Sequence, residues 1–135
     1  MIRKSETVCV YFIGSILYNL IELLWRGYTH WSMGMAGGVC LTLLHLVNQR
    51  KKRAAWPVRC LIGCGLITAV EFTAGLIVNR FCGLDVWDYS DRRFNLLGQI
   101  CPLYSAFWLL LTIPAYALSD RVRRFFDYLI RREGG

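Results

Sequence analysis

The stretch that decides the fold is VRCLIGCGLITAVEFTAGLIV, residues 58–78. After Arg59 it carries a single charged residue, Glu71. About 20 apolar residues in an α-helix, at a rise of ~1.5 Å each, cross the ~30 Å of hydrocarbon in a bilayer. The stretch therefore predicts a transmembrane helix that contains one carboxylic acid.

Three further apolar runs of similar length lie at residues 7–25, 31–47 and 96–118. Hydrophobic residues make up 56% of the 135-residue chain, and the mean hydropathy is +0.39. A soluble domain of this length would alternate amphipathic segments instead of repeating near-continuous apolar runs. We therefore predict an all-α membrane protein with one domain, residues 1–135, and four transmembrane helices.

The last segment, residues 119–133, has a different pattern from these runs. Its apolar residues recur at helical spacing on one face, and arginines and aspartates fill the other. This pattern predicts a C-terminal amphipathic interfacial helix with Ser119 as its N-cap, lying along the cytoplasmic leaflet. The alternative is a solvent-exposed helix that docks on a partner protein.

The basic residues predict the orientation of the chain in the membrane. Of the 16 lysines and arginines, 12 fall at the two ends and between the second and third apolar runs, and 4 fall elsewhere. The positive-inside rule then places both termini in the cytoplasm, so the protein is multi-pass. Because the basic runs sit where helices end, they indicate a partnership with the lipid bilayer, and no nucleic-acid partner is predicted.

Polar residues inside or beside the apolar runs mark the candidate site, because such groups are costly in lipid. The third connection, residues 83–101, is the longest polar one. If it folds back as a lid, its polar groups can meet the glutamates of the first and third helices. We predict one outward-facing pocket formed by Glu22, Arg26, Glu71, Asp88, Tyr89, Asn95 and Gln99. Trp87 and Tyr89 would anchor the lid in the membrane interface, and Ser90 would help to form its turn.

Small residues and cysteines have simpler interpretations. Gly34-x-x-x-Gly38 and Gly65-x-x-x-Ala69 predict faces for close helix packing. Prolines 102 and 114 are predicted to lie inside the fourth helix and to bend it. Cys60, Cys64 and His45 could approach one another, but membrane helices often use cysteine as a small apolar residue. No metal and no other cofactor is predicted.

One part of the lid carries a resemblance to a known family. The residues are Trp87, Asp88, Tyr89, Ser90, Phe94, Asn95, Gly98 and Cys101, with Glu71 before them and Glu22 to Gly27 in the first half. With these residues the chain resembles the Putative ABC-transporter type IV family of small bacterial membrane proteins. The resemblance implies a permease-like component in the bacterial cytoplasmic membrane. It also implies a separate ATPase partner, because the chain has no G-x-x-x-x-G-K-[ST] motif for nucleotide phosphates.

Three classes of function remain open at this stage. The first is a transport-type protein for a small solute or ion, assembled as a homo-oligomer because one chain is too small to enclose a wide path. The second is a membrane-embedded enzyme acting on a lipid or a lipid-linked substrate, with Glu22 and Glu71 as acid and base. The third is a structural membrane subunit in which the polar groups only join the helices. No G-x-S-x-G or H-E-x-x-H motif favours the enzyme.

Overall fold

The computed structural model describes residues 3–27, 30–84 and 86–134. The elements in order are α1 (Lys4–Arg26), α2 (Trp31–Arg50), α3 (Trp56–Gly75), the π-helix η1 (Leu76–Phe81) and α4 (Pro102–Glu133). Over these ranges the fold is all-α, and the only β pairing is an isolated bridge between Leu96 and Ile100. The predicted fold class is therefore confirmed as helical.

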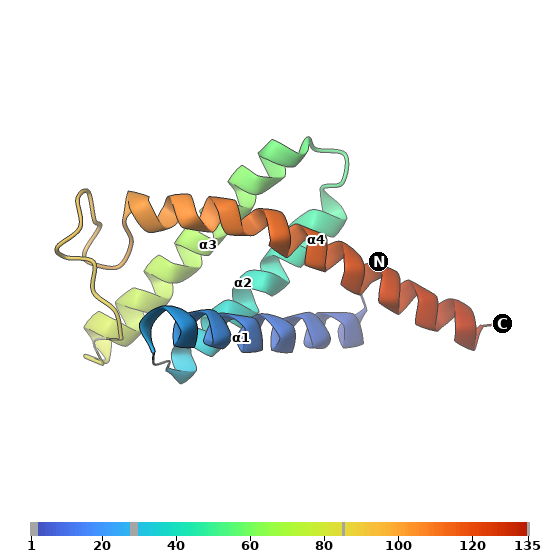
Figure 1. Ribbon diagram of the computed structural model, residues 1–135, viewed down its shortest axis with the longest axis horizontal. Helices are drawn as coiled ribbons and strands as arrows, with labels where there is room; N and C mark the ends of the chain where they lie inside the picture. The colour runs from blue at the N-terminus through green and yellow to red at the C-terminus, as the bar shows by residue number, and fades with distance from the viewer. Residues whose placement is uncertain (1–2, 28–29, 85, 135) are drawn as a thin grey trace.

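The helices alternate in direction, so that each connection lies at one of the two ends of the bundle (Figure 1). Both termini lie at the same end as the link from α2 to α3. The end of α1 and the loop 82–101 lie at the opposite end. We call these the termini end and the loop end. This is the arrangement that four consecutive membrane crossings would give.

Among the described residues, three helical segments are long and apolar enough to cross a membrane: Lys4–Trp25, Trp56–Phe81 and Pro102–Glu133. The helix α2 is not one of them, although it has 20 residues. It contacts each of the other three helices, and its buried face includes Ser32, His45 and Asn48. A helix surrounded by other helices can carry such polar groups, because they find partners in protein and not in lipid.

The glycine face of α2 packs on α1 at very close range, as the Gly34-x-x-x-Gly38 pattern predicts. A Cβ atom added at Gly37 would lie 2.3 Å from the Cβ of Tyr18, a separation that real side chains do not reach. Gly65 differs from its prediction, because nothing lies within 4 Å of an added Cβ there. Its neighbour Gly63 makes the close contact of α3, with an added Cβ 2.5 Å from the hydroxyl of Tyr116.

The helix α4 differs from the sequence prediction at both ends. It begins at Pro102 and not at residue 96, since residues 96–101 form a turn in which Leu97 and Gly98 have positive φ angles of 54° and 73°. Pro102 occupies the start of the helix, where its missing N–H costs nothing, and only Pro114 lies inside.

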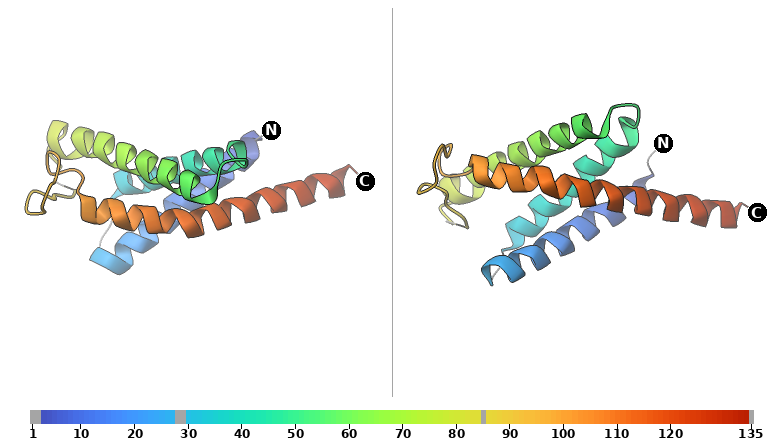
Figure 2. Two further views of the ribbon diagram at one scale, coloured as in Figure 1. Left: turned by 90° about the horizontal axis from the view of Figure 1, so that it is seen from above. Right: turned by 45° about the horizontal axis from the view of Figure 1, so that its top comes forward.

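The helix also continues without a break through Ser119, which is buried and is not an N-cap. At ~1.5 Å per residue its 32 residues are ~48 Å long, more than the hydrocarbon thickness. Its last turns extend beyond the rest of the bundle (Figure 2).

The centre of the bundle is apolar. Leu44 of α2 packs with Cys60 and Ile67 of α3 and with Trp108 and Tyr116 of α4. This layer separates two polar regions, one at each end of the bundle, and these regions are the candidates for function.

Candidate functional site

The carboxylate of Glu71 is the centre of the polar region at the loop end. Glu71 is 9% exposed and lies on α3. Its Oε1 accepts a hydrogen bond from the hydroxyl of Tyr89 at 2.9 Å, and its Oε2 accepts one from Nε1 of Trp108 at 2.8 Å. One carboxylate thus joins α3, the loop and α4, and it fixes two aromatic rings.

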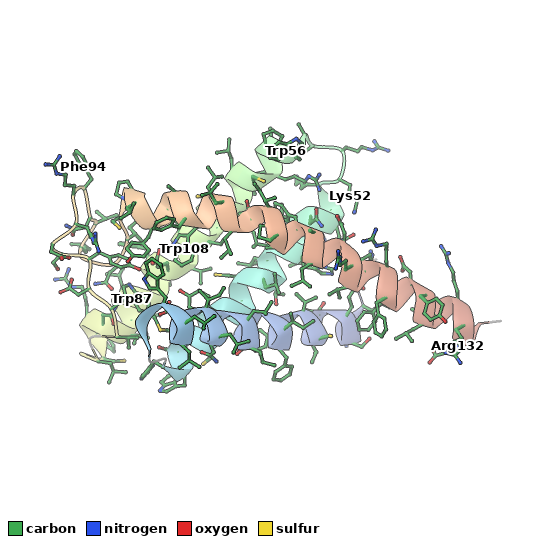
Figure 3. The ribbon with its side chains drawn as sticks, in the orientation of Figure 1. Lys52, Trp56, Trp87, Phe94, Trp108 and Arg132 are labelled. Atoms are coloured by element: carbon green, nitrogen blue, oxygen red, sulfur yellow. The ribbon has the colours of Figure 1, made fainter. Side chains whose placement is uncertain are left out.

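Two cavities adjoin these rings. The smaller has a volume of about 20 Å³ and touches Glu71 directly, which is enough space for one water molecule. The larger has a volume of about 200 Å³ and shares with the smaller the walls Met33, Trp87, Tyr89 and Trp108. We call it the loop-end cavity; its other walls are Glu22, Trp25, Asp88, Asp91, Arg92 and Tyr104. Figure 3 shows Trp87 and Trp108 close to the loop, at the end of the bundle opposite Lys52 and Trp56.

Three of the predicted pocket residues line this cavity. They are Glu22, which is 8% exposed, together with Asp88 and Tyr89. Glu71 lies behind Tyr89 and Trp108, within electrostatic range of Glu22. Arg26 ends α1, and its side chain lies outside the part of the chain that the structure describes.

The loop is held from inside the bundle and not from the membrane interface. Trp87 is 8% exposed, packs with Met33 and Val78, and donates from Nε1 to the backbone oxygen of Gln99 at 3.1 Å. Instead, the exposed apolar side chains of the loop include Phe94, which is 87% exposed and points away from the bundle (Figure 3). The sequence suggested Trp87 and Tyr89 as anchors in the membrane interface because aromatic residues are common both at that interface and in protein interiors.

Asp88 and Ser90 form the predicted turn. The backbone N–H of Ser90 donates to Oδ1 of Asp88 at 2.9 Å, and the Ser90 hydroxyl donates to the same oxygen. These bonds hold the pKa of the Asp88 carboxyl below its usual range, so it stays ionised at neutral pH. Gly98 closes over this turn, since an added Cβ there would lie 2.8 Å from Oδ1 of Asp88. Neither Ser90 nor Asp91 caps the next helix, because Cys101 is the N-cap of α4.

Asn95 and Gln99 do not share a helical face, because they lie in the turn before α4. Asn95 organises the loop by donating to the backbone oxygens of Ser90 and Arg92 at 3.2 and 2.8 Å. Gln99 is 4% exposed and accepts from Nδ2 of Asn79 at 2.8 Å. Both line a second hollow of about 400 Å³ on the other side of Trp87 and Asp88. The predicted single pocket is therefore two neighbouring hollows in the structure.

The sequence analysis missed the polar region at the termini end. Glu6, fully buried, accepts from Nη1 of Arg123 at 2.8 Å and pairs with Nε2 of His45 at 2.7 Å. Nδ1 of His45 lies 2.6 Å from the hydroxyl of Ser119, to which Asn48 also donates at 3.1 Å. We call Glu6, His45, Asn48, Ser119 and Arg123 the termini-end cluster. An acidic residue only two positions after Lys4, in an otherwise basic N-terminus, was the signal in the sequence that could have found it.

The hydrogen bonds around His45 determine which of its two ring nitrogens carries the proton. The Ser119 oxygen accepts from the side-chain amides of Asn48 and Gln49, which fill its two lone pairs. The hydroxyl proton must then go to Nδ1 of His45, so Nε2 carries the ring proton and donates it to Glu6. His45 is thereby a buried connector among three helices. The residues described include no group of three or more His, Cys, Asp or Glu that could hold a metal ion.

The order serine–histidine–carboxylate in this cluster is that of a nucleophilic triad. A nucleophile must reach its substrate, however, and Ser119 is 2% exposed and His45 1% exposed. We therefore interpret the termini-end cluster as the polar contact that holds the helices together at this end, and the loop-end cavity as the candidate site.

Apolar helices of membrane-spanning length, with polar groups buried between them at the two ends of the bundle, define a helical membrane protein. The chain belongs to the Putative ABC-transporter type IV family, whose model matches residues 10–132. It is thus a transport-related membrane protein, and the family expected from the lid residues is confirmed. No solved structure matches the chain.

Proposed function

We propose that this protein is the membrane component of a transport system and that its loop-end cavity admits a small solute from outside. The observation that carries the proposal is the cavity itself, about 200 Å³ in volume, with the buried carboxylate of Glu22 in its wall. A carboxylate placed away from water is costly, and in membrane proteins such groups usually mark a solute or ion site.

The geometry favours binding over catalysis at this site. An acid–base pair would need both glutamates to face the reacting molecule. Both oxygens of Glu71 are already engaged by Tyr89 and Trp108. Glu71 therefore positions the rings of the cavity wall, whereas Glu22 lines the cavity itself.

We also propose that all four helices cross the membrane, with both termini in the cytoplasm. Two observations support this topology. Both termini lie at the same end of the bundle as the α2–α3 link, and basic residues are in excess at that end. The exposed Phe94 fits a loop at the outer interface. Cysteines placed at Ser90 and at Lys51, in a chain without its native cysteines, test the orientation in intact cells. An impermeant thiol reagent should label position 90 and not position 51, and the reverse pattern would refute the orientation.

The proposal includes partners. The sequence has no nucleotide-binding motif, so an ATP-driven system of the kind the family name describes would need a separate ATPase. The basic surface at the termini end, with the extended end of α4, is where such a partner would dock. The apolar layer between the two polar regions supports a homo-oligomer. In the residues that the structure describes, this layer leaves no polar path through a single copy, so a path between copies is the alternative.

Reactivity of a cysteine in the cavity wall tests whether the site admits a solute. Met33 is 4% exposed and lines the cavity, so Met33→Cys should react with small charged methanethiosulfonates in the purified, cysteine-free protein. Val10→Cys is the matched control: it is 1% exposed and lies ~18 Å along α1 from Glu22. If position 33 is as unreactive as position 10, the cavity is closed and the polar groups only join the helices.

A further inference from the structure

We propose that the loop-end cavity binds a small organic ammonium ion, such as a methylated amine. This inference rests on the proposed function, because it names the class of solute that the same cavity would take. It follows from the composition of the wall, in which five aromatic side chains line the cavity together with the buried carboxylate of Glu22: Trp25, Trp87, Tyr89, Tyr104 and Trp108.

The charges around the cavity select for a cation. Three carboxylates line it, those of Glu22, Asp88 and Asp91, against one guanidinium, that of Arg92. Asp88 is held in its ionised form by Ser90. These carboxylates would repel an anionic solute, and the repulsion is strongest at the buried Glu22, where little water screens the charge.

The aromatic wall already interacts with one cation. The guanidinium carbon of Arg92 lies over the ring of Tyr104, 5.9 Å from its centroid. That ring also stacks on Tyr89 at 4.6 Å between centroids. A ring face attracts cations within about 6 Å, and cages of such rings recognise quaternary ammonium groups. The contact with Arg92 shows that at least one ring of the wall presents its face to a positive charge.

The polar atoms of three of the five rings are already satisfied by the protein. Tyr89 and Trp108 donate to Glu71, and Trp87 donates to the backbone oxygen of Gln99. These three rings therefore have no free donor for a solute. The same hydrogen bonds fix their orientation, so that their contribution to the cavity is aromatic surface. The hydroxyl oxygens of a sugar-like solute would find no donor on these three rings, whereas a quaternary ammonium requires no hydrogen bond at all.

The volume and the wall also separate an organic cation from a metal ion. About 200 Å³ corresponds to roughly six or seven water molecules at ~30 Å³ each, below the ~300–1,000 Å³ of drug-sized sites. A hard metal cation requires about six oxygen ligands at close range. The carboxylates of the wall form no group of three that could hold a metal ion among the described residues, and five of the ten wall residues are aromatic, so a small alkylated cation is the better match.

The test uses the full chain in nanodiscs of phosphatidylglycerol, titrated with choline and with its neutral isostere 3,3-dimethyl-1-butanol. Binding is followed by calorimetry and by tryptophan fluorescence. Choline should bind at least tenfold more tightly than the isostere. Glu22→Gln should weaken choline binding at least tenfold, whereas Glu133→Gln, at an exposed position on the end of α4, should leave it unchanged.

A second variant covers the case in which Glu22→Gln fails to fold. Trp25 is 68% exposed, so Trp25→Leu should fold normally and still weaken choline binding. Nanodiscs that contain phosphatidylcholine distinguish the two sources of the ammonium group. If lipid headgroups fill the site, these discs should reduce choline binding in proportion to their phosphatidylcholine content; if the solute is free, they should not. Either result supports an ammonium site.

Two results would overturn the inference. Equal binding of choline and its isostere would remove the requirement for charge, while leaving a solute cavity in place. No choline binding would also refute the ammonium site. If, in addition, Met33→Cys is unreactive, the proposed function is refuted with it; if Met33→Cys reacts, the cavity takes another class of solute.

Discussion

Two replacements of Glu71 test whether its carboxylate holds the rings of Tyr89 and Trp108 in place. Its two oxygens accept from two donors of different kinds. The indole N–H of Trp108 can only donate, whereas the hydroxyl of Tyr89 can also accept. In Glu71→Gln the amide oxygen can face Trp108 and the amide nitrogen can donate to Tyr89, so both contacts survive. In Glu71→Leu neither contact survives, and two buried donors lose their partner.

The expected loss of stability follows from these two bonds. Hydrogen bonds between membrane helices contribute about 0.6 kcal/mol on average and at most about 1.7 kcal/mol. Loss of both bonds in Glu71→Leu should therefore lower the free energy of unfolding by about 1–3 kcal/mol. Glu71→Gln should lose about 1 kcal/mol or less, because bonds to an uncharged acceptor are weaker but are not absent.

Unfolding by sodium dodecyl sulfate in mixed micelles, followed by near-ultraviolet circular dichroism, measures both variants. The signal reports the loss of fixed aromatic packing across the chain, in which Trp108 and Tyr89 take part, and Glu133→Gln is the control for removal of a carboxylate. If Glu71→Gln is as unstable as Glu71→Leu, the exchange of donor and acceptor at Tyr89 does not occur. If Glu71→Leu is as stable as the native chain, the carboxylate does not hold these rings.

Three further perturbations test the fold in the same unfolding assay. Gly37→Ala should destabilise by about 1–3 kcal/mol because the new Cβ overlaps Tyr18, whereas Gly65→Ala, which faces open space, should be neutral or slightly stabilising. Glu6→Gln should lower the free energy of unfolding by about 2–4 kcal/mol, since it leaves Arg123 without its buried carboxylate. A double-mutant cycle with Arg123→Gln should give a coupling energy between the two residues of at least about 1 kcal/mol. Removal of residues 128–135 should leave the helices inserted and the melting transition unchanged; loss of insertion would place the end of α4 in the core.

The sequence was sufficient for the features that depend on length and composition. Apolar runs of about 20 residues predicted where the helices lie, because the thickness of a bilayer leaves few alternatives. The glycine pattern of α2 predicted its close contact with α1, since only glycine allows such an approach. The beginning of α4 was misplaced because Asn95 to Cys101 are apolar enough to continue a helix, and only the backbone shows that Leu97 and Gly98 form a turn.

The polar regions were less predictable, because they depend on which helix faces meet. Glu71 and Tyr89 are 18 positions apart, and Glu6 and Arg123 are 117 apart, so no local spacing links them. The cost of polar groups in lipid correctly selected Glu22, Glu71 and Tyr89 as residues that would need partners. The same cost could not reveal that Asn95 donates to backbone oxygens of its own loop, because those bonds depend on the backbone geometry of the loop.

The two polar regions have different relations to the solvent, and this difference bears on how a solute could move. The termini-end cluster is closed, with its members bonded to one another and almost no exposed surface. Between it and the loop-end cavity, α4 runs from Tyr116 to Trp108, ~12 Å of helix packed against Leu44 and Ile67. Passage through one copy would require this apolar layer to open. Because Ser119 and Arg123 lie on α4, a movement of α4 away from α1 and α2 would also break their bonds to His45 and Glu6. Under the proposed function, a solute held at Glu22 would be released inward by separation of α4 from α2 and α3, and the partner that we propose at the extended end of α4 would drive this movement.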